Sequence, residues 1–545
     1  MEHALRVKRW VAWCEANFIW LLLIAGAVLL LTNLGNIYLW QDEAETAMLS
    51  QRLGTLGLPL AFDGRNLIRQ APQDVQYTED YVWVYHPWLP FYLTSLSLWF
   101  FGPTTFAARL PYALAGLATI CLLYNTTQRY FGRHIAILAS TLLLFCVPFA
   151  LHARQCKYFA FAALFTVATL DAYLRMRDSD SPRFALPYFI SAAFCLFQSN
   201  FGAFVPLMAA IGLHLLATHP RRPQLKRFVL AGVILVVYVL PWAVYLQTWA
   251  RGRFSFDVIR FVGHLVHYAV YVTGWVFPAL LLIPFALLLA SQFRTSGQVH
   301  RETSVLSLYL LACLLTVLFL SATFIWMYFS YIVQLVPLLM VLLAWTLWHL
   351  LQRWRLIGYA LLAVLITTNL LHAFPYALPI TRQFKWASLA PRPYLAETDA
   401  LLAAAGRIRS DPKDYAYELV HDYNGPNEGI VQFLRQQAEP SDLVVANYGE
   451  LPIAFYTGLR IAGGLSGYRL DEASSAEWII NRRDGPYRDE LARLISEGSY
   501  EPIEIPYPDL PWGNRPVPEY HKFATVHGVP NVVIYHRNDE VGRSE

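Results

Sequence analysis

Three acidic side chains stand directly after the first long apolar stretch of the chain, in the string QDEAE: Asp42, Glu43 and Glu45. A carboxylate at the end of a membrane helix can take a proton from a hydroxyl or an amine while a lipid-linked molecule lies in the bilayer beside it. The plainer alternative is an acidic cluster that only faces water, which costs little at such a position. We predict that Asp42 is a general base, with Glu43 as the second candidate.

A basic and polar group follows a later apolar stretch, in the string HARQCKYFAFAALF, which contains Arg154, Lys157 and Tyr158. Arginine and lysine neutralise the charge that develops on a departing phosphate oxygen, so this group predicts a phosphate-binding site. In the alternative, the two cations only extend from the membrane interface toward water.

Two histidines, His264 and His267, lie three residues apart in the string VGHLVHY. A helix would put both imidazoles on one face, which suits two ligands of a metal ion. With Asp257 or the acidic cluster as a further ligand, such a site would suit Zn²⁺ or Mn²⁺ better than Mg²⁺. Both histidines could equally be polar surface residues. No other cofactor is indicated, and the basic group could neutralise a phosphate without a metal.

These groups must be positioned by a membrane protein. Of the 545 residues, 56% are apolar and only 15% are charged, against about 25% charged in an ordinary soluble domain. Residues 1–375 hold 25 Lys and Arg and 14 Asp and Glu, a net charge of +11, whereas residues 376–545 hold 17 and 24, a net charge of −7. This pattern excludes a soluble enzyme. It predicts a membrane domain over 1–375 and a soluble domain over 376–545, with no nucleic-acid partner.

An apolar stretch needs about 20 residues to cross the ~30 Å hydrocarbon layer as a helix. The sequence holds eleven candidate stretches, and up to thirteen spans fit the pattern. We therefore predict a mainly α, polytopic membrane protein. The stretches begin near Phe18, Phe106, His134, Lys157, Phe184, Phe201, Phe228, Tyr268, Ser304, Tyr328 and Leu356.

The segment 40–105 lies between the first two spans. Its apolar string HPWLPFYLTSLSLWFFG (86–102) is short and Pro-rich at its start, so we interpret it as a helix that lies at the interface. Cytoplasmic loops carry an excess of Lys and Arg. This interpretation places sixteen basic residues of the membrane domain inside, beginning with Arg6, Lys8 and Arg9.

An odd number of spans puts the tail on the same outer face as the segment 40–105. The expected location is thus an inner (plasma) membrane, with the site and the C-terminal domain on its outer face. The tail is predicted to be α/β: EGIVQFLRQQ forms a helix, DLVVAN a strand, the residues after it a second helix, and VPNVVIYHR a further strand.

Several strings of the chain carry a family resemblance by their order and spacing. They are DE (42–43), HPWLPFYL, FGPTTFAARLPYALAGLATICLLY, FGRHIAILAS and ARQCKYFAFAALF. Over approximately residues 15–340 the chain resembles the C-type (GT-C) integral-membrane glycosyltransferases that use polyprenyl-phosphate sugars. That group includes the protein O-mannosyltransferases, the lipid A aminoarabinose transferase and the catalytic subunits of oligosaccharyltransferases.

The resemblance implies a GT-C fold, interfacial helices in the first outer loop, and a polyprenyl-phosphate sugar as the donor. It implies that Asp42 is the catalytic base. By the same resemblance the donor-phosphate contacts fall on Arg154, Lys157 and Tyr158, and the pocket for donor and acceptor is shaped by His86, Tyr85 and Glu45.

Two departures from the family pattern narrow the function. The tail lacks the WWD-type sequence of the oligosaccharyltransferase branch, which favours transfer of a single hexose or pentose. Many bacterial members carry an Arg-Tyr pair late in the membrane region, where this chain has Ser330 before Tyr331. A phosphate contact from this position is therefore not expected. The acceptor is a glycolipid, a polysaccharide or a protein.

Two other classes remain open from the sequence. A transporter or lipid flippase would show inverted repeats and ionisable residues near the bilayer centre. Here the charges sit at the ends of the predicted spans, with Asp171 the main exception, close to the inner edge. A non-enzymatic assembly or adhesion protein would leave the acids and bases of the outer loops unexplained.

Overall fold

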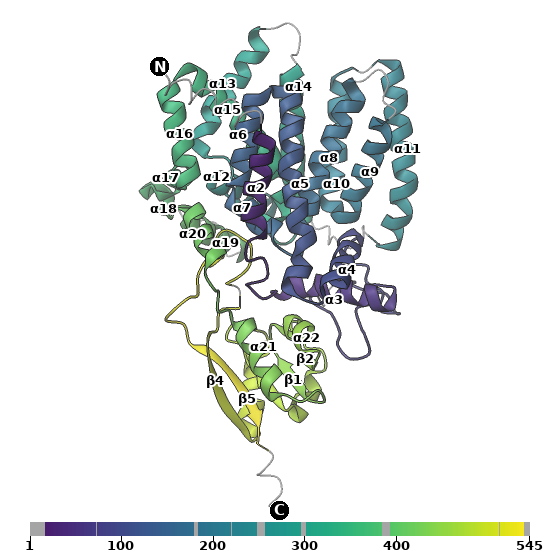
Figure 1. The fold of residues 1–545 in the computed structure, drawn as a ribbon, viewed down its shortest axis with the longest axis vertical. Coiled ribbons are helices and arrows are strands. Elements are labelled where there is room, and N and C mark those ends of the chain that lie inside the picture. The colour runs from purple at the N-terminus through teal and green to yellow at the C-terminus, as the bar shows by residue number, and fades with distance from the viewer. Residues whose placement is uncertain are drawn as a thin grey trace, which may run out of the picture.

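The computed structural model describes residues 17–71, 74–178, 184–219, 221–247, 257–295, 301–383, 393–511 and 513–538. A bundle of apolar helices stands on one side of a smaller domain that contains the sheet (Figure 1). Among the described residues, five of its helices are long and apolar enough to cross a membrane, and up to eight spans result when three bent helix pairs are each counted as one. The chain is therefore a multi-pass membrane protein.

Each of the eleven predicted stretches begins on a helix of the bundle or within two residues of one. Three of these helices, α2, α9 and α10, have only 14, 15 and 17 residues. They are shorter than 18 residues and are therefore not counted among the spanning helices above. The unbroken helices are α2 (Phe18–Leu31), α5 (Thr105–Phe131), α8 (Phe159–Asp178), α9 (Ala185–Ser199), α10 (Phe201–Ala217), α11 (Arg222–Tyr245), α14 (Arg301–Thr323) and α15 (Val336–Arg353), which the 3₁₀ turn η2 (Phe329–Leu335) precedes.

Three spans are bent rather than straight. The pairs are α6 (Arg133–Leu144) with α7 (Val147–Ala153), α12 (Val258–Trp275) with α13 (Ala279–Thr295), and α16 (Arg355–Thr367) with α17 (Leu370–Ala377), at 66°, 93° and 85°. The span predicted from Tyr268 thus contains a break between α12 and α13. Pro278 lies at this break; it has no N–H to donate and disfavours helical geometry in the residue before it.

The segment 40–105 forms two helices, α3 (Gln41–Leu56) and α4 (Leu89–Phe101), between the bundle and the C-terminal domain (Figure 1). Large aromatic side chains on α4 are exposed, Trp99 by 76% and Phe100 by 64%. Such a face belongs at the boundary between lipid and water. The structure has a helix within the predicted segment 86–102, and its position at the interface stays a prediction.

The tail contains a five-stranded sheet with the strand order β2-β1-β3-β5-β4. β1 pairs in parallel with β2 and β3, and β5 runs antiparallel to β3 and β4. The strands are β1 (Leu443–Ala446), β2 (Arg460–Gly463), β3 (Trp478–Ile480), β4 (Tyr500–Pro508) and β5 (Asn531–Arg537).

Of the predicted tail elements, the helices α21 (Pro426–Gln437) and α22 (Glu450–Thr457) and the strands β1 and β5 are confirmed. The predicted boundary at 375/376 falls inside α17, and residues 384–392 lie outside the described residues. The remaining tail elements are α18 (Pro379–Gln383), α19 (Pro393–Ala405), α20 (Asp411–Val420), η4 (Leu470–Ser475) and α23 (Arg488–Glu497). Because α19 packs on α12 and α22 packs on α3, the tail is joined to the membrane region at several points.

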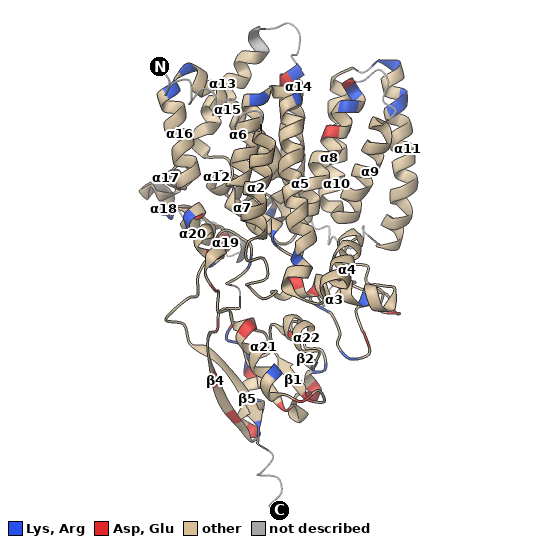
Figure 2. Cartoon of the chain, viewed as in Figure 1, with Lys and Arg blue, Asp and Glu red and all other residues tan. Residues whose placement is uncertain are grey.

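Charge is distributed unevenly along the molecule. Basic side chains gather at the end of the bundle that lies away from the sheet domain (Figure 2). Asp171, fully buried at this end, has its carboxylate 2.6 Å from Arg175 Nε. The basic residues Arg6, Lys8 and Arg9 lie outside the described residues.

Candidate active site

The acidic group begins helix α3, directly after an extended residue at Trp40. The carboxylate of Glu43 accepts a 3.5 Å bond from the Trp40 backbone N–H, and negative side chains in a first turn are favoured by the helix dipole. Residues three apart on a helix share a face. Asp42 and Glu45 therefore point to one side of α3, and Glu43 points to another.

Asp42 and Glu45 meet Lys157, which lies just before α8. Lys157 Nζ donates to Glu45 Oε1 at 2.6 Å and lies 3.5 Å from the backbone oxygen of Asp42. Gln70 Nε2 donates to the other oxygen of Glu45 at 2.7 Å. Lys157 and Glu45 are nearly inaccessible to solvent, whereas Asp42 is half-buried. Two predicted groups more than 100 residues apart thus form one cluster.

The segment that contains Tyr85 and His86 joins the same cluster. His86 Nδ1 lies 3.4 Å from Glu45 Oε1, and its ring is 4.8 Å from that of Tyr85 and 5.7 Å from that of Tyr158. The residues predicted to bind phosphate and to shape the pocket are therefore adjacent, with the exception of Arg154. We call the set of Asp42, Glu45, His86, Lys157 and Tyr158 the acidic–basic cluster.

Electrostatics in this cluster favour a charged lysine. Burial acts to lower the pKa of Lys157, but the neighbouring Glu45 and Asp42 outweigh it, and this pKa lies above its usual value. Burial raises the pKa of Glu45, while Lys157 opposes that shift. Burial also raises the pKa of Tyr158, whose hydroxyl remains a neutral donor at physiological pH. The cluster therefore combines a fixed cation with a carboxylate that retains access to solvent.

Glu43, the second predicted base, is engaged elsewhere. It is fully buried, and its two oxygens accept from Nε and Nη2 of Arg109 on α5 at 2.8 and 2.7 Å. The backbone N–H of Cys156 donates to the same carboxylate at 2.7 Å. With its oxygens occupied by these three donors, Glu43 ties α3 to α5 and to the turn before α8. We therefore revise its role from base to structural ion pair.

Arg154 is also used within the fold. Its guanidinium donates to backbone oxygens at the end of α2, among them Thr32 at 2.8 Å and Asn33 at 3.3 Å. These carbonyls have no partner inside the helix, so a cation here satisfies them. Arg154 thus stabilises the end of α2, and the phosphate contact predicted for it has no support in this arrangement.

The two histidines lie on one face of α12, as their spacing predicted. Both are buried, and His267 Nδ1 lies 3.1 Å from the Thr398 hydroxyl of α19. Asp257 is used as the N-cap of α12, where it accepts from the N–H groups of Ile259 and Arg260. In the described part of the chain, no group of three His, Cys, Asp or Glu side chains could hold a metal ion.

The C-terminal domain holds the strand-like segment that leads into Asp42. Nδ2 of Asn514 donates to the Tyr38 carbonyl at 3.0 Å, and Nδ2 of Asn427 donates to the Leu39 carbonyl at 3.1 Å. The hydroxyl of Tyr456 accepts from the Leu39 N–H at 3.0 Å. One residue before Asp42, Gln41 Nε2 donates to Glu450 Oε1 at 2.5 Å.

Two tyrosines feel the charges of both Asp42 and Arg515. Burial raises the pKa of Tyr448 of the C-terminal domain, the Arg515 guanidinium lowers it, and the Asp42 carboxylate raises it. Burial also raises the pKa of Tyr328, which precedes η2, and the same two charges act on it in the same directions.

Comparisons with known proteins find a family model and solved structures to which this chain is similar. Residues 85–245 match the model of the family described as dolichyl-phosphate-mannose-protein mannosyltransferase. The apo crystal structure of ArnT from Cupriavidus metallidurans superposes with a TM-score of 0.59 at 16% identity, covering 95% of this chain and 98% of that one. The chain has the GT-C membrane fold.

A second structure of the same ArnT, bound to undecaprenyl phosphate, superposes with a TM-score of 0.57 at 14% identity, over 95% of this chain and 98% of that one. No curated protein sequence matches the chain. The resemblance found in the sequence is therefore confirmed at the level of the GT-C fold.

Two residues of the site in this GT-C fold were not predicted from the sequence. Tyr448 follows β1, and side chains at the carboxyl ends of parallel strands commonly reach a site, so its place after DLVVAN was a usable signal. Arg515 lies in an irregular segment between β4 and β5, more than 470 residues from Asp42. No motif or spacing in the sequence connects Arg515 with Asp42.

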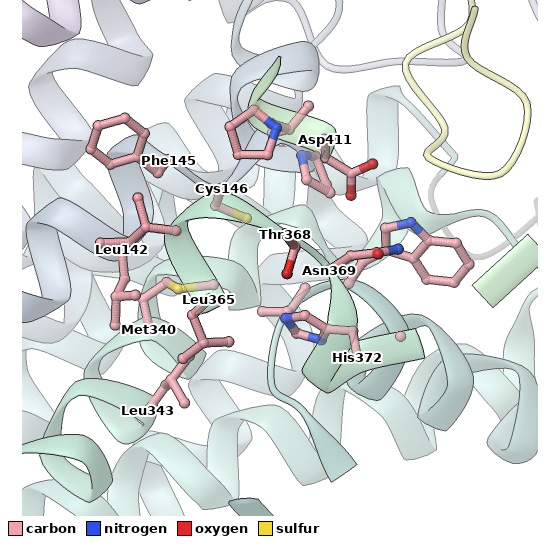
Figure 3. A pocket seen from close by; sticks show the side chains of 17 residues that line it. Leu142, Phe145, Cys146, Met340, Leu343, Leu365, Thr368, Asn369, His372 and Asp411 are labelled. Carbon is pink, nitrogen blue, oxygen red and sulfur yellow. The ribbon is translucent and has the colours of Figure 1, made fainter. Parts of the chain in front are cut away.

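A separate small pocket lies between the bundle and α20 (Figure 3). Its walls are mainly apolar, as Leu142, Met340 and Leu365 show, and its volume of about 60 Å³ has room for only a few water molecules. Asp411 on its rim is paired with Arg409. This pocket shares no lining residue with the acidic–basic cluster and is too small for a sugar donor.

Proposed function

We propose that this protein is a membrane glycosyltransferase that moves a single hexose or pentose from a polyprenyl phosphate to an acceptor. The acceptor is a glycolipid, a polysaccharide or a protein. The observation that carries the proposal is the position of Asp42 beside Lys157, where a GT-C bundle meets its outer segment. A family model for a dolichyl-phosphate-dependent transferase and a fold shared with an undecaprenyl-phosphate-binding protein support the class of donor.

The arrangement fits an inverting displacement at the anomeric carbon. The acceptor oxygen or nitrogen attacks this carbon, and its proton passes to Asp42. The bond between the anomeric carbon and the phosphate oxygen breaks, and its electron pair leaves with the polyprenyl phosphate. Lys157 stabilises the charge that develops on the phosphate, and the neutral hydroxyl of Tyr158 can donate to the same group. Glu45 holds Lys157 in place.

The transporter or flippase alternative has less support from the structure. Asp171, the acid inside the predicted spans, is neutralised by Arg175 at 2.6 Å and faces Arg129 at 3.7 Å, near the basic end of the bundle. A buried acid with two fixed cationic neighbours is a poor carrier of protons or ions. The acidic–basic cluster lies instead at the opposite end, beside α3 and α4.

A turnover assay with purified protein tests the proposed function directly. Radiolabelled polyprenyl-phosphate hexoses and pentoses are supplied with total glycolipid, polysaccharide and protein fractions of the host. We expect the label to move to one acceptor class and polyprenyl phosphate to be released. Movement of intact donor across vesicle membranes without cleavage of the sugar–phosphate bond would favour the flippase instead.

The proposed orientation puts the acidic–basic cluster and the C-terminal domain on the outer face of an inner (plasma) membrane. Support comes from the basic end of the bundle, which is expected to face the cytoplasm (Figure 2). We expect protease added to right-side-out vesicles to cut the C-terminal domain, and protease added to inside-out vesicles to spare it. The reverse pattern would contradict the orientation.

Metal dependence is a separate proposal. We expect activity to survive an excess of chelator, because Lys157 supplies a fixed cation at the reacting phosphate. His264 and His267 contribute only two of the ligands a site would need, and Asp257 caps α12. Elemental analysis of purified protein, with activity measured after chelation, checks this. Loss of activity that Zn²⁺ or Mn²⁺ restores would instead support a metal site at the two histidines.

A further inference from the structure

The positive charge in and around the acidic–basic cluster is largely engaged in contacts within the protein. Arg109 is bound to Glu43, and Arg154 is bound to the carbonyls at the end of α2. Lys157 is paired with Glu45 at 2.6 Å, and Asp42 adds a second carboxylate beside it. A phosphate that enters next to two carboxylates is repelled unless further positive charge faces it. With Lys157 as its one cation, the net charge of the group formed by Lys157, Glu45 and Asp42 is negative.

Arg515 brings a guanidinium to this place from the C-terminal domain. Its Cζ lies over the ring of Trp40, 5.1 Å from the ring centroid, two residues before Asp42. Stacking on an indole restrains the planar guanidinium group. Arg515 also acts on Tyr328 and Tyr448, the two tyrosines on which the Asp42 carboxylate acts. The stacking on Trp40 and the neighbouring bond from Asn514 to Tyr38 therefore hold this arginine beside the residues that lead into Asp42.

The backbone around Arg515 is fixed relative to the membrane region. On one side of it, the Asn514 side chain donates to the Tyr38 carbonyl at 3.0 Å. The Arg515 carbonyl itself lies 2.8 Å from Nδ1 of His521, and Nε2 of that ring is bonded to the buried Glu418 at 2.5 Å. These hydrogen bonds on both sides of Arg515 restrain the backbone that carries its side chain.

Resting on the proposed function, we propose that Arg515 binds the phosphate of the polyprenyl-phosphate donor as the second cation beside Lys157. The C-terminal domain then completes the active site in addition to covering it. A guanidinium presents two parallel N–H groups to a phosphate, whereas an ammonium acts as a point charge. Arg515 would thus orient the phosphate, and Lys157 would neutralise the oxygen that leaves.

The test compares lipid binding to the purified full-length protein in detergent. Undecaprenyl phosphate is titrated against wild type, Arg515→Ala and Arg515→Lys, with undecaprenol as the uncharged lipid and inorganic phosphate as the lipid-free anion. Charge-assisted hydrogen bonds predict that Arg515→Ala weakens undecaprenyl phosphate binding by about 10- to 100-fold. Arg515→Lys should lose less, and undecaprenol binding should be the same for all three proteins.

Arg493→Ala is the matched control, because it removes a positive charge from an exposed position on α23 of the same domain. We expect it to bind both lipids as wild type does. Inorganic phosphate should bind more weakly than the lipid form but show the same dependence on Arg515. Arg515→Lys, with its thermal unfolding measured, serves if Arg515→Ala does not fold.

Several outcomes would overturn the assignment. Equal affinity of Arg515→Ala and wild type for undecaprenyl phosphate, with slower transfer to the acceptor, would place Arg515 at the acceptor. An equal loss of undecaprenyl phosphate and undecaprenol binding would make it a structural residue. If wild type itself showed no preference for undecaprenyl phosphate over undecaprenol, the proposed function would fail, and the role of Arg515 with it.

Discussion

Asp42→Asn is expected to leave a folded, membrane-inserted protein with turnover reduced by about 10²- to 10⁴-fold, the usual effect of removing a general base. The amide cannot accept the proton of the acceptor, although it has nearly the same size and can keep the helical start at α3. Asp42 is half-buried, and its side chain makes no ion pair within 4 Å among the described residues, so stability should change little. Turnover of the polyprenyl-phosphate sugar by purified protein is the measurement.

Asp80→Asn is the matched control, since it removes an exposed carboxylate from the same outer segment. It should retain wild-type turnover. If Asp42→Asn kept more than about a tenth of wild-type turnover, Asp42 would not be the base. A normal affinity of Asp42→Asn for undecaprenyl phosphate would place the defect after donor binding, because the proposed phosphate contacts are Lys157 and Arg515.

Much of the fold was predictable because its strongest signal is local. Each apolar stretch of about 20 residues must become a helix in a bilayer, whatever its neighbours are. The break at Pro278 was missed because the apolar pattern continues across it from α12 into α13. In the tail, β2, β3 and β4 were missed. β2 and β3 have only four and three residues, and the sequence YEPIEIPYP of β4 is interrupted by prolines, which argue against a strand.

Site residues were predictable where the residue type and a position at the end of a predicted span were enough to select them. Asp42 and Lys157 were selected as polar residues at the ends of predicted spans, and His86 by the family resemblance. The structure brings the three together. Glu43 and Arg154 passed the same selection, but they are used as an ion pair and a helix cap. Which of two adjacent acids faces α5 depends on the packing of α3, and the sequence shows no partner for either.

The buried pair of Glu43 and Arg109 gives the second large effect, on stability. Glu43→Gln should destabilise the protein by about 3–5 kcal/mol, because Arg109 would remain as an uncompensated charge at a fully buried position. The amide oxygen can still accept from the Cys156 N–H, so the loss isolates the ion pair. Thermal unfolding in detergent and the fraction of monodisperse protein measure the change.

A second variant separates this structural role from a catalytic one. Replacing both partners, Glu43→Gln with Arg109→Met, removes the stranded charge and should recover much of the stability, since a buried pair is often exchanged for apolar groups at little cost. Activity should return with it if Glu43 serves only to hold α3 against α5. A stable but inactive double variant, beside an active Asp42→Asn, would move the proton acceptor from Asp42 to Glu43. The acidic–basic cluster would then lack its base, because Glu43 points to a different side of α3 from Asp42 and Glu45.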